Sequence, residues 1–137
     1  MPRKDESHAA RVDAWLEAEA GRLSPPERRL LFEDALTALS RRARRTLGDA
    51  TLRAIVDRVL FTAIERYPLL AAIEIEGERI RWNGEPPRGE LTGEAELEAG
   101  RFVLVELFTV LGILTGGILS PSLHAELASV KRTEVGT

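Results

Sequence analysis

Apolar residues recur at helical spacing over most of the chain and switch to alternate positions over one short stretch. Four segments carry an apolar residue at every third or fourth position, which predicts helices that bury one face: residues 8–20, 25–47, 50–67 and 94–119. A fifth, short helix is predicted to start at Ser120-Pro121. The pattern therefore predicts a mostly helical protein.

The second helix has the strongest start signal. Ser24, Pro25 and Glu27 match a capping box, in which the serine precedes the helix and the glutamate side chain bonds back to it. Gly48 is predicted to end this helix, and Asp49 can cap the next one. The second and third helices are therefore expected to follow each other closely.

Residues 73–82 alternate between apolar and charged side chains, as expected for a β-hairpin. If Gly77 and Glu78 form the two-residue turn, one face of the hairpin is apolar and opposite charges face each other on the other. This register places Ile73 opposite Trp82, Glu74 opposite Arg81, Ile75 opposite Ile80 and Glu76 opposite Arg79. A two-stranded hairpin is marginal alone in water, so its apolar face must pack on helices.

These elements predict an α+β fold that is mostly α: a helical bundle around one long apolar helix, with a single two-stranded hairpin at 73–82. We expect one domain over residues 8–130, between a disordered tail at 1–7 and a frayed tail at 131–137. Residues 83–93 are predicted to be a loop, with Thr92 as the cap of the following helix.

Residues 102–119 are apolar on nearly every side. A helix of this kind must be surrounded by its own fold, by a second subunit or by lipid. The segment only reaches the lower limit of membrane-spanning length, and Glu106 lies within it, so no membrane span is expected. A core helix and a helix shared between two subunits remain as alternatives.

Thr109, Gly112 and Gly116 form a stripe of small residues on this helix, and the two glycines have GxxxG spacing. Glycine weakens a helix, so its presence favours the close approach of another backbone. The alternative is that Gly116-Gly117 is only a bend before Pro121. With the neighbouring apolar positions, the predicted interface consists of Leu104, Phe108, Thr109, Leu111, Gly112 and Gly116.

The amino-acid composition excludes several kinds of catalytic and metal-binding site. The 137 residues include no cysteine and only two histidines, and the net charge is −3. Thiolate metal sites, disulfides and cysteine nucleophiles are therefore excluded, and we expect neither a metal nor a cofactor. Glycine-rich phosphate loops and a hydrolase nucleophile motif are missing from the sequence. No secretory signal opens the sequence, so a cytoplasmic location is expected.

Two features suggest alternative functions. Arg41, Arg42, Arg44 and Arg45 are predicted to form a solvated basic patch opposite the apolar stripe of their helix, where they could bind nucleic acid. His124, in the last helix, is a candidate phosphoacceptor for a phosphotransfer protein or a sensor-kinase-like dimerisation domain.

The leading hypothesis from sequence is a non-enzymatic bacterial adaptor or regulatory module that acts through protein–protein contact, as a homodimer. The excess of apolar surface in residues 102–119 favours it. A sensor that binds a small apolar ligand between the long helix and the hairpin is a further alternative.

Overall fold

The computed structural model describes residues 4–21, 23–77, 79–82 and 93–131. The predicted Thr92 cap, most of the predicted 83–93 loop and residues 132–137 of the predicted C-terminal tail lie outside the described residues. The elements are α1 (Lys4–Glu19), α2 (Pro25–Leu47), α3 (Asp49–Arg66), the 3₁₀ helix η1 (Pro68–Ala72), β1 (Ile73–Glu76), β2 (Arg79–Trp82), α4 (Gly93–Thr115) and α5 (Ser120–Ser129).

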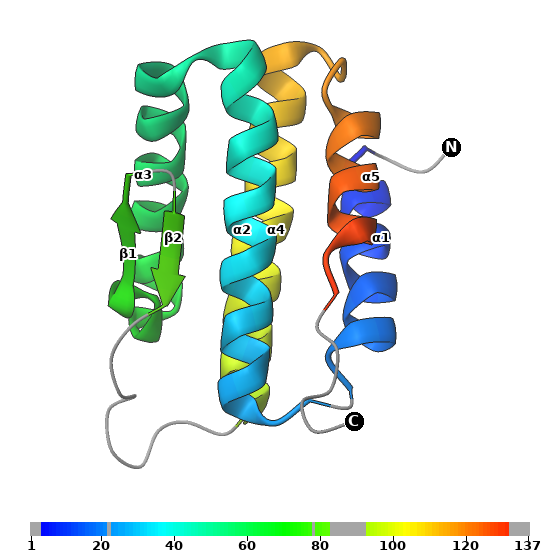
Figure 1. Cartoon of the computed structure of the whole chain (residues 1–137), viewed down its shortest axis with the longest axis vertical. Coiled ribbons are helices and arrows are strands. Elements are labelled where there is room, and N and C mark those ends of the chain that lie inside the picture. Colours follow the sequence, from blue (N-terminus) through cyan, green and yellow to red (C-terminus); the bar gives the residue numbers. More distant parts are fainter. Residues whose placement is uncertain (1–3, 22, 78, 83–92, 132–137) are drawn as a thin grey trace.

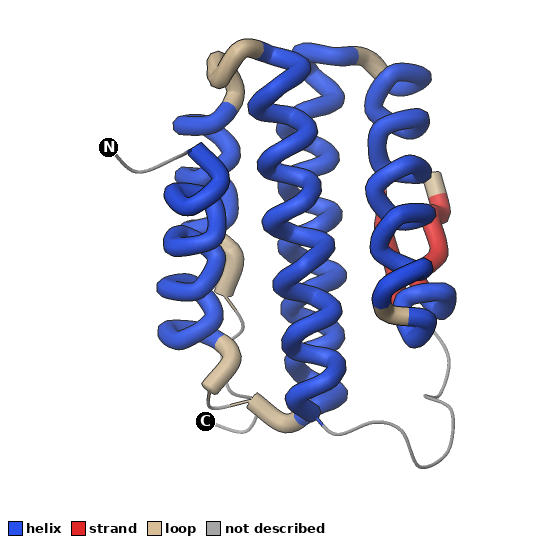
Figure 2. The backbone as a smooth tube through the Cα atoms, turned by 180° about the vertical axis from the view of Figure 1, so that it is seen from behind, coloured by secondary structure: helices blue, strands red, loops and turns tan. Residues whose placement is uncertain are grey.

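The described residues form a bundle of five α-helices and one antiparallel hairpin, which confirms the predicted fold class. In Figure 1 the helices run roughly parallel or antiparallel to one another, with α2 and α4 in the middle, α3 and the hairpin on one side and α1 and α5 on the other. Seen from behind, α4 runs between α1 and α3 (Figure 2).

The sequence predicts one long helix at the centre of the bundle, whereas two helices lie there. Helices α2 and α4 both have 23 residues, and both contact helices on either side of them. One face of α4 is buried, while Val105, Glu106 and Thr109 on its opposite face are half-buried. The first helix also differs, because α1 begins at Lys4 and includes residues that were predicted to belong to the disordered tail.

In the core, a side chain of α2 packs directly against the backbone of α4. Phe32 of α2 is 1% exposed, and its ring lies against Trp15 and Trp82, with centroid distances of 6.2 and 6.0 Å. A Cβ atom on Gly100 of α4 would lie only 2.5 Å from the Phe32 ring. Gly100 is therefore a glycine that permits close helix packing, a role that was one of two alternatives for Gly112 and Gly116.

The hairpin has the predicted register at all four residue pairs. Ile73, Ile80 and Trp82 are buried, so its apolar face packs on the helices as expected. On the charged face, the ion pair runs diagonally from Arg81 to Glu76, at 3.7 Å. Opposite charges on alternate positions therefore stabilise the solvent side while the apolar side is covered.

Side chains from α2 satisfy the outer edge of β2. Glu33 Oε2 accepts a hydrogen bond of 3.0 Å from the backbone N–H of Trp82, and Thr37 Oγ1 accepts one of 3.1 Å from that of Ile80. An unpaired strand edge is a site of aggregation, and here a helix covers it. The polar residues Glu33 and Thr37 thus position the hairpin along α2.

The chain turns sharply between α4 and α5. Helix α4 ends at Thr115, before the predicted end at residue 119, and both Gly116 and Gly117 have positive φ, at 62° and 83°. The pair is therefore a bend, the alternative considered above, and Gly116 is not part of a helical GxxxG interface.

Helix α1 is fastened to the bundle at two points. Trp15 Nε1 donates a buried hydrogen bond of 2.9 Å to the backbone carbonyl of Val130, just past α5. On the surface, Arg101 of α4 makes two hydrogen bonds to Asp13. These contacts hold α1 against both α4 and α5.

Candidate functional site

Most of the predicted interface is buried inside the monomer. Leu104, Phe108 and Leu111 are at most 1% exposed, and Gly112 is also buried. This part of the prediction is corrected, because the chain's own α1, α2 and α5 lie on that face of α4. Thr109 is half-buried on the opposite side, where its hydroxyl donates to the carbonyl of Val105 at 2.8 Å.

Exposed large apolar side chains lie instead on the last turn of α4 and just beyond it, with a separate one on α3 and one, Leu30, on α2. Ile113, Leu114 and Ile118 are 74%, 59% and 80% exposed, and Phe61 of α3 is 68% exposed. Side chains of this size are normally covered in a monomeric protein when they lie together. Phe61 falls outside the apolar stripe of its helix, and this departure from the pattern was a signal available in the sequence.

A groove of about 680 Å³ lies between α3 and α4, and the exposed Leu114 is one of its lining residues. The full lining is Ala50, Thr51, Ala54, Ile55, Arg58, Val59, Thr62, Glu106, Val110 and Leu114. We call the groove, with Ile113 next to Leu114, the α3–α4 face. Small and apolar residues form most of the groove, which suits the packing of another helix.

The groove carries one charge of each sign. Arg58 lies on α3 and Glu106 on α4, and within the described part of the chain neither forms an ion pair or hydrogen bond. Arg58 is exposed and Glu106 is half-buried. Two opposite charges without partners at one apolar groove are available to a complementary surface.

The four arginines of the predicted basic patch differ in exposure and in their contacts. Arg41 and Arg45 are exposed, as predicted. Arg42 is half-buried and donates to Ser122 Oγ at 3.5 Å, while Arg44 is half-buried with its Nε 2.9 Å from Asp49 Oδ1. The prediction of four solvated arginines on one face is therefore wrong for Arg42 and Arg44, because α5 and the start of α3 pack beside them.

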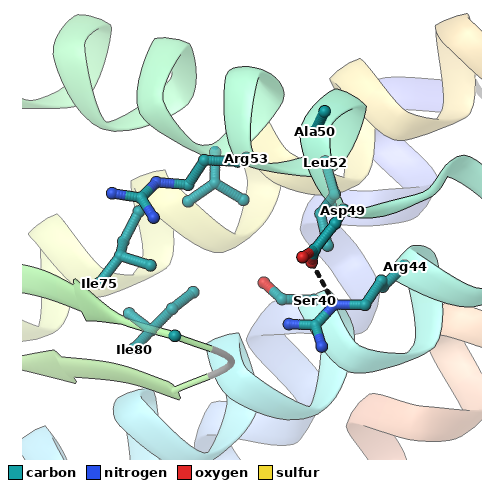
Figure 3. Close-up of a pocket in the computed structure, with 10 residues that line it drawn as sticks. Ser40, Arg44, Asp49, Ala50, Leu52, Arg53, Ile75 and Ile80 are labelled. Atoms are coloured by element: carbon teal, nitrogen blue, oxygen red, sulfur yellow. Dashed lines mark ion pairs between the residues drawn. The ribbon is translucent and has the colours of Figure 1, made fainter.

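Arg44 lines a second cavity, between α2, α3 and the hairpin (Figure 3). The close-up shows Ser40, Arg44, Asp49 and Arg53 around an opening above Ile75 and Ile80. This cavity lies beside the hairpin, as the small-ligand alternative expected, but α3 forms its wall in place of α4.

His124 is half-buried and paired with the other histidine. His8 Nδ1 and His124 Nε2 share a hydrogen bond of 2.9 Å, and both rings contact Phe108. Burial lowers the pKa of His124 below its usual 6.5, and the neighbouring His8 and Arg11 lower it further. A phosphoacceptor must offer a free nitrogen to a partner's active site, so this geometry does not favour the phosphotransfer alternative.

Across the described residues, no group of three or more His, Asp or Glu side chains could hold a metal ion. The same residues include no helix with the length and apolar content needed to cross a membrane. The sequence matches no known protein family, and comparisons with curated proteins and with solved structures found no similar protein.

Proposed function

We propose that the protein is a non-enzymatic adaptor or regulatory module that acts through protein–protein contact and forms a homodimer through the α3–α4 face. The observation that carries this proposal is one largely apolar groove that holds the exposed Leu114 and two opposite charges, Arg58 and Glu106, which have no partner among the described residues. The sequence hypothesis of a homodimer is retained, but its interface moves to the opposite side of α4.

A second copy of the chain is the occupant that fits the charges. In a two-fold symmetric dimer the same patch faces itself, so each contact occurs twice. Arg58 of one protomer can then pair with the partner's Glu106, and Glu106 with the partner's Arg58. A patch with a single sign of charge would repel its copy, whereas this groove is self-complementary.

The composition of the face is also suitable. A stable interface is apolar at its centre with charged groups at the edge. The groove is lined mainly by alanine, threonine and aliphatic side chains, and the neighbouring Ile113 is 74% exposed.

Charge reversal tests the proposal. We expect Arg58→Glu and Glu106→Arg each to weaken dimerisation by about tenfold or more, because both symmetric pairs become repulsive. The double variant restores the pairs in reversed order and should regain most of the affinity. Sedimentation equilibrium over a wide concentration range measures these constants.

Arg41→Glu is the matched control, since Arg41 is exposed on α2 and lies outside the groove. It should leave the dimer constant unchanged. A parent protein that stays monomeric at all concentrations would overturn the proposal, and so would a dimer that withstands both single reversals.

A further inference from the structure

The cavity beside the hairpin lies along a polar stripe of α2. Glu33, Thr37, Ser40 and Arg44 follow one another at spacings of three or four residues on α2, and so they form this stripe. The first two bond to the backbone of β2. The last two line the cavity.

Ser40 is the unusual member of this stripe. It is only 5% exposed, yet its hydroxyl has no hydrogen-bond partner among the described residues. Buried hydroxyl groups are nearly always bonded, because an unbonded one loses its interaction with water and gains nothing. In Figure 3 the Ser40 oxygen points into the cavity, towards the space between Ile80 and Arg53.

The rest of the cavity has an apolar wall and a charged rim. Its volume is about 490 Å³, within the range of small-molecule sites. Leu52 and Val56 of α3 and Ile75 and Ile80 of the hairpin provide apolar walls. Leu52 and Ile80 are themselves at most 4% exposed, so these walls belong to the core and are not free to collapse.

The charged residues of the rim already form two ion pairs, Arg44 with Asp49 and Arg53 with Asp57. Arg44, Asp49 and Arg53 are its charged residues, two cations and one carboxylate. The ion pair of Arg53 with Asp57 uses Nε, at 3.4 Å, which leaves the terminal guanidinium nitrogens of Arg53 for another acceptor. Helix α3 also begins at this rim without a side-chain cap, so its first backbone N–H groups add positive potential.

We propose that this cavity binds a small organic monocarboxylate, with its apolar tail against the isoleucine, leucine and valine walls. The carboxylate accepts hydrogen bonds from Ser40 Oγ and from the Arg53 guanidinium. A monocarboxylate needs only the terminal guanidinium nitrogens of Arg53, whereas a phosphate dianion would bring a second negative charge towards Asp49. The apolar walls distinguish such a ligand from small hydrophilic acids.

Four probes test the chemistry by isothermal titration calorimetry on the full chain. Octanoate has the proposed head and tail, octan-1-ol lacks the charge, octylammonium reverses it and acetate lacks the tail. We expect saturable binding of octanoate, at least tenfold tighter than that of each other probe. Equal binding of octanoate and octanol would overturn the proposal, as would the absence of octanoate binding.

Variants then test the assigned residues. Ser40→Ala and Arg53→Gln should each weaken octanoate binding by about tenfold, since each removes a hydrogen bond to a charged group. Arg41→Gln is the control and should bind like the parent. Ser40→Ala should also raise the thermal midpoint of the unliganded protein, which shows that it still folds. Unchanged octanoate affinity in both variants would refute the assignment.

Discussion

Replacing Gly100 by alanine should destabilise the protein, even though alanine favours helices. The added Cβ would lie 2.5 Å from two atoms of the Phe32 ring and 2.6 Å from a third. Carbon atoms prefer separations of about 3.5–4.0 Å, so the ring must retreat by about 1 Å. It has little room to do so, because Trp15 and Trp82 lie against it.

The size of the effect follows from two opposing terms. Overpacking a well-filled core costs about 1–3 kcal/mol, and a rigid, fully buried ring places this case near the upper end. The gain in helix propensity from glycine to alanine is about 1 kcal/mol. The free energy of unfolding should therefore fall by about 2 kcal/mol.

Urea denaturation measures this loss as a lower midpoint with an unchanged slope. Gly112→Ala is the matched control on the same helix: its Cβ would be 3.4 Å from Ser120 Oγ and 3.5 Å from His8 Nε2, ordinary or slightly close contacts. It should be neutral or stabilising by up to about 1 kcal/mol. In a Phe32→Leu background, Gly100→Ala should cost much less.

The reasoning is refuted if Gly100→Ala is as stable as the parent, because α2 and α4 could not then approach as closely as described. A Gly112→Ala variant that loses as much stability as Gly100→Ala would also contradict it. That second result would return the close-packing role to the GxxxG pair that the sequence first suggested.

Two further predictions concern polar groups in the core. Because the pKa of His124 is lowered in the folded state, the unfolded chain binds more protons below about pH 6.5, so stability should fall as the pH drops from there through the folded pKa. Urea midpoints measured at several pH values should fall less steeply with decreasing pH in His124→Gln than in the parent protein. An equal pH dependence in the two proteins would contradict this. The Glu96 carboxylate, 9% exposed, lies 3.2 Å from Arg29 Nε, whose side chain is 23% exposed, so Glu96→Ala should cost about 2 kcal/mol by removing this partner from a half-buried cation. The exposed pair Arg53–Asp57 is the comparison, and Asp57→Ala should change stability by less than about 0.5 kcal/mol in the same assay.

The candidate sites were only partly predictable. Phe61 departs from the polar pattern on the outer face of α3, and such a departure can be found in a sequence, whereas Ser40 fits the polar stripe of α2. What makes them interesting cannot be found there, because it depends on neighbours from other elements. Among the described residues, no helix covers the side of α3 that carries Phe61, and no group bonds to the Ser40 hydroxyl.

The sequence by itself determined the local elements and the hairpin register. Helix starts and ends depend on a few neighbouring residues, such as Ser24 and Glu27, whose side chains bond across one turn. The alternation of residues 73–82 specifies the register because a shift by one position would expose the apolar face. These interactions are short in range, so they can be read along the chain.

Only the tertiary structure decided which side of α4 is the core and which glycine allows close packing. Helix α4 is apolar on most sides, so its own pattern does not state which side its neighbours will cover. The choice depends on the packing of α1, α2 and α5 against it, through contacts such as Phe32 with Gly100. Such contacts join residues far apart in the chain, and their energies depend on shapes that no local pattern records.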